Sequence, residues 1–365
     1  MRALVSALGA LGHDVDLLTF PQGEALDLPR LTHRRSPRLP VGHVRPGFSA
    51  AKLLLDGPFM LEAWWRMAWG RYDVVHAVEE AAHLAAPLAA LLRLPLIVDV
   101  DSAIPDQLRE RGASGAHPLV WAAETLERNA LRRAAAVVTV CTSLTDRVRE
   151  RAPGVPVFQI EDPPLGTDRP ANATDVSALR AQLRLDARPV VLYSGNFEPY
   201  QGVDLLLGAA ALLPEAQVVL MGGEAAEIAA LSTRPGGAVF AGKRPPEELP
   251  AFLALADVLV SPRRQGVNTP FKVYTYLASG KPLVATRSPT HTQLLDDTTA
   301  FLVEATAEGL AGGIRSALAQ PEEASRRAAA GRLLIEREYS PARYLEKVRT
   351  AYADVEALVS ARPQR

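Results

Sequence analysis

The sequence predicts an α/β protein made of two Rossmann-like domains, each built on a parallel β-sheet and facing the other across a cleft. Short apolar stretches alternate with amphipathic helical stretches along the 365 residues. The apolar stretches are nearly continuous runs of Val, Ile and Leu, which is typical of parallel strands buried on both faces. A Pro-rich joint, IEDPPLGTDRP at 160–170, interrupts the alternation, which then starts again. We expect domains at 1–164 and 165–340, and a helix at 341–365 that packs back on the first domain.

The expected strands divide between the two halves. Those of the first half are 15–20, 74–78, 95–100, 136–140 and 155–160, with helices between them at 80–93 and 142–151. Those of the second half are 189–195, 216–223, 238–242, 257–262, 282–286 and 300–304.

Glycines repeatedly follow the strands of the second half, at Gly195, Gly222, Gly223, Gly242 and Gly266. One such glycine serves a turn, but several at the same edge favour a place where the backbone approaches a ligand closely. Open α/β sheets bind their ligands at the carboxyl ends of the strands. The pattern therefore predicts an anion-binding crevice at this edge.

Composition excludes several classes of protein. The 40 basic and 41 acidic residues give a net charge of −1, which provides no overall attraction to nucleic acid. The single cysteine, Cys141, excludes an internal disulfide framework and fits a cytoplasmic protein. No spacing of His, Asp or Cys suggests a metal site, so we expect none.

The stretch GVNTPFKVYTYLASGKP, at 266–282, predicts a short helix with Thr269 as N-cap, Pro270 at the first helical position and Gly280 past the end. Lys272 then lies in the first turn, where the helix dipole disfavours a cation. A cation beside the unpaired N–H groups of a helix start becomes favourable once a phosphate lies between them. A diphosphate is the simplest ligand that satisfies this arrangement.

Several segments carry a resemblance to a known family. In the second half they are YSGNFEPYQGVDLLLGAAALLP (193–214), VFAGKRPPEELPAFLALADVLVSP (239–262), NTPFKVYTYLASGKPLVAT (268–286) and HTQLLDDTTAFLV (291–303). In the first half they are RALVSALGALGHDVDLLT, YDVVHAVEEAAHLAAPLAALLRLPLIVDVDS and LERNALRRAAAVVTVCTSLTDRV. The chain resembles the family 4 glycosyltransferases, whose fold is called GT-B.

The resemblance implies a retaining transferase that takes a sugar from a nucleotide-diphosphate donor without a metal. The donor would bind 165–340, and a glycan or lipid-linked acceptor would bind the first domain, in cell-envelope or exopolysaccharide synthesis. Lys272 and Asp101 are the catalytic candidates, and Glu79 and Ser102 are the acceptor-side candidates. The donor-binding candidates are Gly195, Asn196, Gln201, Gly242, Lys243, Arg264, Asn268, Thr269 and Thr275.

The sequence departs from the family around Lys272. Family members usually have Glu, seven residues and a second Glu in this loop and helix, for contacts with the donor sugar and the ribose. The matching positions are about Val267 and Thr275, so both carboxylates are absent. Asn196 and Gln201 replace an Arg and a Lys that the family usually offers to the diphosphate. Thr275 lies three residues after Lys272, on the same helix face, and can still hydrogen-bond a hydroxyl.

A second departure concerns the first strand. The family begins with a β-strand and a Gly-rich loop before the helix that opens this chain. In a doubly wound sheet the first strand lies in the middle, so its loss would split the sheet. We expect a misplaced start, with roughly 15–40 upstream codons for an apolar strand and its loop. The alternative is a compromised first domain.

Polar residues gather after the strand at 95–100, in VDVDSAIPDQL: Asp99, Asp101, Ser102 and Asp106. Asp101 stands about where the family often keeps a His near the sugar, so it either holds a sugar or acceptor hydroxyl or belongs to a helix cap. Glu79, at another strand end, has the same two interpretations. His291 follows a donor-edge strand and is interpreted as a first-turn histidine rather than a ligand contact.

Trp64, Trp65 and Trp69 stand close together in LEAWWRMAWGRYD, at 61–73. Basic residues accompany them, at Arg34, Arg35, Arg38, Arg45, Arg66 and Arg71. Aromatic and basic surfaces settle at membrane interfaces, so 34–71 could form a peripheral contact at the inner face of a membrane. The alternative is that tryptophans at helical spacing belong to the core.

Three other classes of protein are weighed against a transferase. A catalytically silent GT-B partner subunit would explain the absent glutamates, and it would bind the donor without turnover. A GT-B nucleotide-sugar epimerase would share the donor site but would need carboxylates for proton transfer. A dinucleotide oxidoreductase is disfavoured because no G-x-G-x-x-G follows the first strand of either half.

Overall fold

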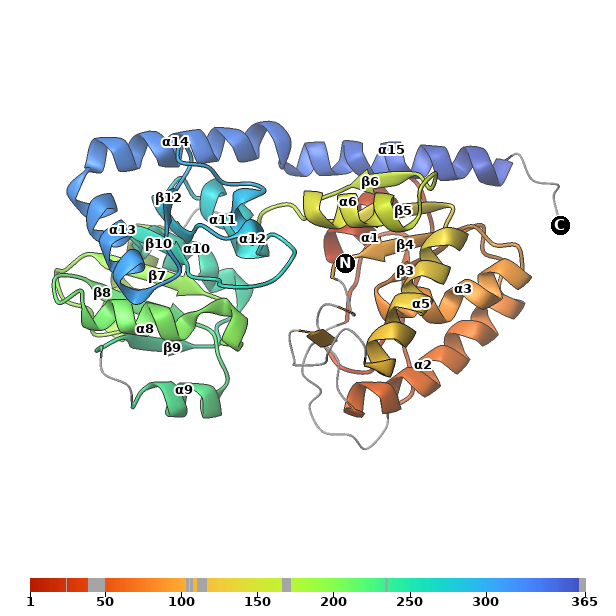
Figure 1. Cartoon of the computed structure of the whole chain (residues 1–365), viewed down its shortest axis with the longest axis horizontal. Coiled ribbons are helices and arrows are strands. Elements are labelled where there is room, and N and C mark those ends of the chain that lie inside the picture. The colour runs from red at the N-terminus through yellow and green to blue at the C-terminus, as the bar shows by residue number, and fades with distance from the viewer. Residues whose placement is uncertain are drawn as a thin grey trace. The chain divides into compact units, whose positions relative to one another are not determined.

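A computed structural model describes residues 1–23, 25–38, 50–102, 105, 108–109, 117–165, 172–233 and 236–360. The chain forms two compact units, Asp162–Arg343 and a unit that combines Met1–Glu161 with Tyr344–Arg365 (Figure 1). Each unit has its own sheet and its own core, and the two are described separately below.

The unit Asp162–Arg343 is built on a six-stranded parallel sheet with the order β12-β11-β10-β7-β8-β9. The strands are β7 (Val190–Ser194), β8 (Gln217–Met221), β9 (Val239–Gly242), β10 (Val258–Ser261), β11 (Leu283–Thr286) and β12 (Phe301–Val303). The helices are α7 (Ala173–Gln182), η1 (Pro199–Gln201), α8 (Val203–Ala211), α9 (Ala225–Leu231), η2 (Pro246–Glu248), α10 (Leu249–Leu255), α11 (Phe271–Ala278), α12 (Pro289–Thr292), α13 (Ala307–Ala319) and α14 (Pro321–Glu338).

Helices cover both faces of this sheet, which is why its strands are apolar on both sides. Val191 and Tyr193 of β7 join a core formed with α8 and α13. Val190 and Leu192 join a second core, formed with α10 and α11. Successive strand residues point to opposite faces, so one short apolar run supplies both cores.

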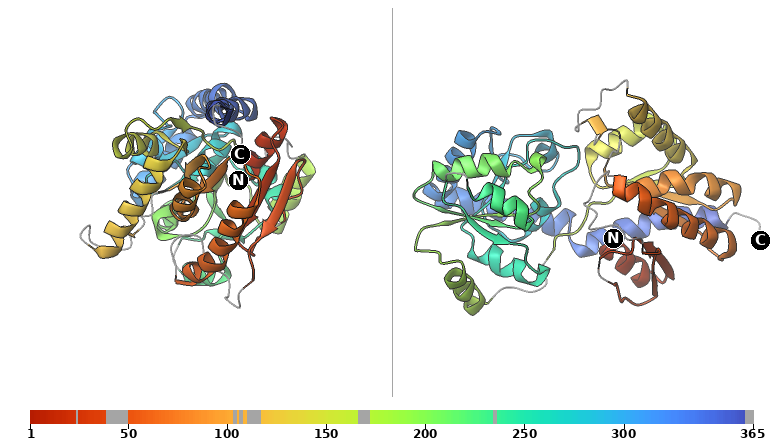
Figure 2. Two further views of the ribbon diagram at one scale, coloured as in Figure 1. Left: turned by 90° about the vertical axis from the view of Figure 1, so that its right-hand side faces the viewer. Right: turned by 90° about the horizontal axis from the view of Figure 1, so that it is seen from below.

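The other unit contains two separate sheets. One has four parallel strands in the order β3-β4-β5-β6, and the other has only β1 and β2. The strands are β1 (Val15–Thr19), β2 (Leu31–Arg35), β3 (Val75–Val78), β4 (Leu96–Val100), β5 (Ala136–Thr139) and β6 (Val157–Gln159). The helices are α1 (Arg2–Ala10), α2 (Ala50–Trp69), α3 (Glu80–Leu91), α5 (Pro118–Arg133), α6 (Thr142–Arg151) and α15 (Pro341–Ser360). Figure 2 shows α1, β1 and β2 in red, apart from the larger sheet.

The sequence-based prediction omits β2, because Leu-Thr-His-Arg-Arg is not an apolar run. This strand lies at the outside of its small sheet, where alternate residues are exposed and polar side chains are tolerated.

Helix α15 packs on the unit that contains the N-terminus. Val348 and Val355 are fully buried in a core with Leu4 and Leu8 of α1. Lys347 forms an ion pair with the buried Glu161, and the hydroxyl of Tyr352 lies 2.6 Å from Nδ1 of His76.

The start of α11 differs from the prediction by one residue. The helix begins at Phe271 with Pro270 at the N-cap, and no side chain caps it, so Thr269 does not cap the helix as predicted. The extended conformation of Pro270 ends the preceding loop, and its missing N–H needs no partner at this place. Gly280 is in the left-handed conformation just past the end, as predicted.

Candidate functional site

Lys272 lies in the first turn of α11, at the carboxyl edge of the six-stranded sheet. Its Nζ is 3.2 Å from Oε1 of Gln201 and 3.8 Å from the ring centroid of Tyr193, to which it makes a cation–π contact. A Cβ built on Gly195, directly after β7, would lie 2.6 Å from the same Nζ. Gly195 also has a φ of +143°. This glycine therefore allows the ammonium group to lie against the strand end.

The charge of Lys272 has no anionic partner within the described residues. Its Nζ contacts the neutral amide of Gln201 and the aromatic face of Tyr193, and no Asp or Glu of the described residues forms an ion pair with it. Burial lowers the pKa of Lys272 well below its usual value, and the positive charge of Arg263 lowers it further. A buried cation of this kind destabilises the unliganded protein and attracts an anion.

Arg263, directly beyond β10, supplies a second buried cation, with 7% of its surface exposed. Its guanidinium donates to the carbonyl of Gln265 and, over 2.9 Å, to Oδ1 of Asn268, and it lies 5.0 Å from the ring centroid of Tyr200. Asn268, predicted to bind the donor, thus orients Arg263. The set of predicted site residues contains Arg264 instead of Arg263, because adjacent arginines are not distinguishable without the burial that separates them.

Several predicted donor residues do not join this cluster through their side chains. Arg264 is exposed and pairs with Asp204 at 3.0 Å, and the exposed Lys243 pairs with Glu224. Asn196 is exposed, although its carbonyl accepts the Tyr193 hydroxyl over 2.6 Å.

Thr275 and Thr269 are buried, with 3% and 7% of their surface exposed. Oγ1 of Thr275 accepts the N–H of Leu165 over 3.0 Å, so this side chain holds the start of the unit. The arrangement gives no support to the predicted contact of Thr275 with a ligand hydroxyl.

The glycines at the strand ends also pack against each other. Gly195 donates its N–H to Met221 over 2.9 Å, and Gly222 donates to Gly242 over 2.8 Å. A Cβ on Gly222 would lie only 1.9 Å from the carbonyl oxygen of Gly195. Gly222 therefore serves the close approach of neighbouring backbone segments, whereas Gly242 has open space around it and a left-handed φ of +70°.

His291 is a buried structural histidine, as the sequence indicates. Its Nδ1 lies 2.8 Å from the carbonyl of Thr286 and its Nε2 lies 2.8 Å from Oγ of Ser261. The contact with a carbonyl requires a proton on Nδ1, so Nε2 accepts from the serine. Burial lowers the pKa of His291 to about 4, which keeps the ring neutral.

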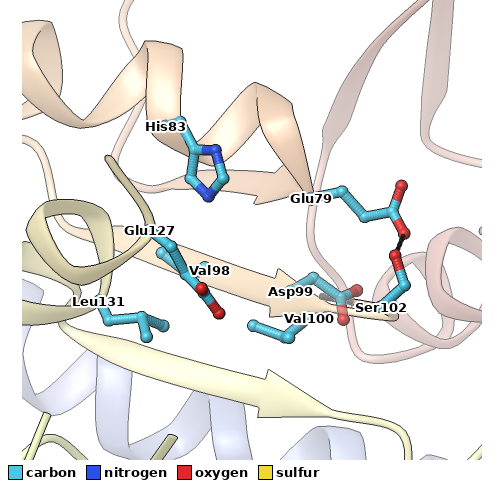
Figure 3. A pocket seen from close by; sticks show the side chains of 8 residues that line it. All are labelled: Glu79, His83, Val98, Asp99, Val100, Ser102, Glu127 and Leu131. Carbon is cyan, nitrogen blue, oxygen red and sulfur yellow. Dashed lines mark hydrogen bonds between the residues drawn. The ribbon is translucent and has the colours of Figure 1, made fainter. Parts of the chain in front are cut away.

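The unit that contains the N-terminus gathers carboxylates at the ends of β3 and β4 (Figure 3). Ser102 donates to Oε1 of Glu79 over 2.5 Å, and Asp99 lies beside them. These residues line a cavity of about 20 Å³, together with His83 and Glu127. A cavity of this size accommodates one water or a single polar group of a ligand.

Asp99 is held from one side only. Its Oδ2 lies 3.1 Å from Nε2 of His76, and burial raises the pKa of Tyr352, whose hydroxyl fixes the other side of that ring. Oδ1 of Asp99 is buried and has no hydrogen-bond partner among the described residues. A buried carboxylate oxygen without a donor indicates a place where a ligand hydroxyl or a water binds.

Glu79 has the conformation φ 51°, ψ −124°, which is costly for a residue with a side chain. Together with Ser102 and Asp99, it forms the acceptor-side cluster. The prediction names Glu79 and Ser102 but not Asp99 as an acceptor-side residue. Asp101 follows β4 in a bend and is partly buried, and Asp106 lies outside the described residues.

Family models match both halves of the chain. Residues 1–158 match a model described as "Glycosyl transferase 4-like domain", and residues 188–320 match one described as "Glycosyl transferases group 1". The chain belongs to the family 4 type of glycosyltransferases. The two matches cover the three sheets, except for the last residue of β6, and the residues around Lys272 and Asp99.

Two curated glycosyltransferases are similar in sequence. A GDP-mannose-dependent alpha-(1-6)-phosphatidylinositol monomannoside mannosyltransferase of Mycolicibacterium smegmatis is 31% identical over 239 residues, which are 59% of this chain and 62% of that protein. An alpha-D-kanosaminyltransferase of Streptomyces kanamyceticus is 29% identical over 238 residues, 59% of this chain and 58% of that protein. The chain thus spans about three fifths of the length of each of these relatives.

Solved glycosyltransferase structures share the GT-B fold. Sucrose-phosphate synthase from Thermosynechococcus elongatus superimposes with a TM-score of 0.79 at 20% identity, covering 98% of this chain and 92% of that one. HepE of Anabaena, solved in complex with UDP-glucose, has a TM-score of 0.68 at 18% identity, covering 84% of this chain and 89% of that one. At these identities the likeness shows the fold alone.

Proposed function

We propose that this glycosyltransferase moves a hexose from a nucleoside-diphosphate sugar to a hydroxyl of a glycan or lipid-linked acceptor, with retention of configuration and without a metal. The observation that carries the proposal is the buried ammonium group of Lys272, which has no anionic partner within the described residues. The mannosyltransferase of M. smegmatis depends on GDP-mannose and HepE was solved with UDP-glucose, and both compounds contain a diphosphate joined to a hexose.

The diphosphate is proposed to bind between Lys272 and the N–H groups at the start of α11. No side chain caps this helix, so its first N–H groups remain available to an anion. Arg263 lies close enough to lower the pKa of Lys272 and adds positive potential to this place. The combination replaces the Arg and the Lys that the family usually places at Asn196 and Gln201.

Lys272 is proposed to act mainly on the leaving group. Negative charge grows on the diphosphate oxygen as the bond to the sugar breaks, so a fixed cation stabilises the transition state more than the bound substrate. Tyr193 and Gln201 hold the ammonium group in place before the donor arrives.

The acceptor hydroxyl is proposed to bind the acceptor-side cluster in the other unit. Oδ1 of Asp99 has the capacity to accept a hydroxyl proton, and Glu79 and Ser102 lie beside it. The carboxylates suit a neutral polyol, because each oxygen accepts hydrogen bonds from hydroxyl groups.

A lipid-linked acceptor would explain the surface of α2. Leu61, Trp65 and Trp69 follow each other at intervals of four residues and are 70%, 58% and 76% exposed, so they are not core residues. Arg34 and Arg66 both contact Asp16 and are therefore occupied within the fold, while Arg45 lies outside the described residues. Within the described ranges, no helix is long and apolar enough to cross a bilayer.

Vesicles of phosphatidylcholine and phosphatidylglycerol should bind the protein, and the double variant Trp65→Ser/Trp69→Ser should lose binding. Equal vesicle binding by the unmodified protein and the double variant would show that this surface of α2 does not contact the membrane.

The proposed activity is tested with the full chain in two steps. Calorimetry with GDP and UDP measures donor binding, and mass spectrometry follows sugar transfer from GDP-mannose and UDP-glucose to phosphatidylinositol vesicles or methyl α-mannoside. Binding at micromolar concentration and transfer to an acceptor are expected. Binding without transfer or hydrolysis of either donor would favour a silent partner subunit, and an epimerised sugar nucleotide would favour an epimerase. Absence of binding to both nucleotides at millimolar concentration would contradict the donor site.

A further inference from the structure

A chain of buried side chains connects α15 with the carboxylate of Asp99. The hydroxyl of Tyr352 lies 2.6 Å from Nδ1 of His76, and Nε2 of His76 lies 3.1 Å from Oδ2 of Asp99. Tyr352 and Asp99 are both buried. The three residues come from α15, β3 and β4, so segments that are 276 and 23 residues apart in the sequence meet at one imidazole ring.

The burial and the contacts of the three groups determine where their protons lie. Burial raises the pKa of Tyr352, and the negative charge of Asp99 raises it further, so the phenol keeps its proton. The hydroxyl donates to Nδ1, and a neutral ring then carries its own proton on Nε2. The opposite tautomer would direct a bare nitrogen at the carboxylate, and neither of these two groups could donate. Each hydrogen bond in the chain is therefore donated toward Asp99.

This chain determines how the carboxylate of Asp99 is oriented. Oδ2 is bound to His76, whereas Oδ1 is buried and has no partner among the described residues. Asp99 lines the small cavity together with Glu79 and Ser102, which are hydrogen-bonded to each other (Figure 3). His76 thus supplies a donor to the buried charge and leaves the second oxygen to a group that can donate a proton.

Packing alone does not require a tyrosine at this place in α15. The surrounding core consists of apolar residues such as Leu8 and Val348. The ring of Tyr352 lies nearly parallel to that of His76, with an angle of 12° between them, and a phenylalanine ring would fill the same space. The hydroxyl adds a buried polar group that is costly unless it is hydrogen-bonded, and its partner is the ring that holds Asp99.

We propose that Tyr352 and His76 are positioning residues of the acceptor site, which hold the carboxylate of Asp99 so that its free oxygen accepts a hydrogen bond from an acceptor hydroxyl. This role rests on the proposed transferase function and makes α15 a part of the acceptor site. Both ring nitrogens of His76 are used within the chain, so the two residues act through Asp99. The free oxygen favours a hydroxyl over an ether or phosphate oxygen, which cannot donate.

Removing the hydroxyl of Tyr352 is the first test. In Tyr352→Phe, kcat/KM for the acceptor should fall by about fivefold, as for the loss of one neutral hydrogen bond. Sugar transfer from GDP-mannose and UDP-glucose to methyl α-mannoside or phosphatidylinositol vesicles measures this value, and calorimetry should find the affinity for GDP and UDP unchanged. Tyr344→Phe is the matched control, because Tyr344 belongs to the same helix and core whereas the hydroxyl at Nδ1 of His76 is that of Tyr352. The control should leave kcat/KM nearly unchanged.

Two variants of His76 separate positioning from packing. The amide nitrogen of His76→Gln lies about where Nε2 lies and still donates to Asp99, whereas that of His76→Asn lies about where Nδ1 lies and faces Tyr352. His76→Gln should therefore retain most of kcat/KM for the acceptor. His76→Asn should lower it by about 10–100-fold, because the buried carboxylate loses its donor. Equal losses in the two variants would show that the ring only fills space and would overturn the proposal.

A double-mutant cycle and a spectroscopic measurement show whether Tyr352 acts through Asp99. In an Asp99→Asn background, Tyr352→Phe should cause no further loss, and a full additional loss would contradict the proposal. The ring ¹⁵N signals of His76 at neutral pH should show a proton on Nε2 and none on Nδ1, and a proton on Nδ1 would also contradict it. Sugar transfer that is insensitive to Tyr352→Phe would overturn this role alone. Absence of transfer by the unmodified protein would overturn the proposed function, and this role with it.

Discussion

The two units place opposite charges at the same topological position. At the carboxyl edge of the six-stranded sheet the buried charges are positive, Lys272 and Arg263. At the carboxyl ends of β3 and β4 the polar groups are carboxylates, Glu79 and Asp99, with Ser102 between them. One edge is therefore suited to an anion and the other to the hydroxyl groups of a neutral ligand.

The two units also differ in the groups that surround the buried charge. Lys272 contacts an amide and an aromatic ring, and no carboxylate of the described residues pairs with it. Asp99 keeps one oxygen bound to His76 and leaves the other free. Both units thus hold one buried polar atom whose partner is expected to be a substrate group, one on the donor and one on the acceptor.

The largest expected effect comes from removing the cation. Lys272→Ala should lower turnover in sugar transfer by about 10²–10³-fold, the range seen when one preorganised electrostatic partner is removed. Donor binding should weaken less, because the charge on the leaving oxygen is greatest in the transition state. Steady-state kinetics with circular dichroism as a folding check measures both effects.

Lys281 provides the matched control, since it follows the same helix and donates to the carbonyl of Ala254 over 3.0 Å. Lys281→Ala should retain turnover within a few fold. A folded Lys272→Ala protein with the turnover of the unmodified protein would show that the cation has no role in transfer.

A smaller effect is expected on the acidic side. In Asp99→Asn the amide oxygen remains bound to the N–H of His76, so an NH₂ group replaces the free oxygen and cannot accept a hydroxyl proton. The value of kcat/KM for the acceptor should fall by about 10–100-fold, which corresponds to a hydrogen bond to a charged group. The affinity for GDP or UDP should not change.

The exposed Asp146 lies in the same unit, and Asp146→Asn serves as the control. If kcat/KM for the acceptor is unchanged in Asp99→Asn, or falls equally in both variants, the carboxylate cluster does not bind the acceptor.

The smallest expected effect is on the thermal stability of the unliganded protein. Lys272→Met removes a buried charge, so it should raise the midpoint of thermal unfolding of the unliganded protein, by on the order of 2–4 °C per kcal/mol. The folded pKa of Lys272 is lowered, so the charge penalty is full below that pKa and shrinks as the pH rises toward the unfolded value of about 10.4. The gain should therefore fall with rising pH.

Lys347 gives the opposite case, because it pairs with the buried carboxylate of Glu161. Lys347→Met should lower the unfolding midpoint, since it removes the cation from that carboxylate. A lower midpoint for Lys272→Met at neutral pH would show that Lys272 is a structural cation.

Much of the fold could be predicted because most strands are short and apolar, and those in the middle of the two larger sheets are buried on both faces. The pattern identified β1 and β3 to β12, whereas β2 was missed because Leu-Thr-His-Arg-Arg lies at an exposed edge. The cap of α11 was displaced by one residue, since Thr269 and Pro270 both suit a helix start and only the backbone conformation distinguishes them.

The site was harder to predict than the fold. Lys272 was identified because a cation in a first helical turn is unusual, and this signal is local. Arg263, Tyr193 and Asp99 were not among the predicted site residues. Their importance depends on burial and on partners far away in the sequence, such as Lys272 for Tyr193 and His76 for Asp99.

The central claim is that Lys272 takes its anionic partner from the donor diphosphate, and proton uptake on binding tests it most directly. Calorimetry of GDP or UDP binding is carried out in buffers of different ionisation enthalpy, at several pH values from about 7.5 to 9.5, above the phosphate pKa of about 6. A nearby anion raises the lowered pKa of Lys272, so the unmodified protein should take up protons on binding and its affinity should fall as the pH rises. Lys272→Met should bind weakly and without this proton uptake. The same proton uptake in both proteins, or none in either, would contradict the account.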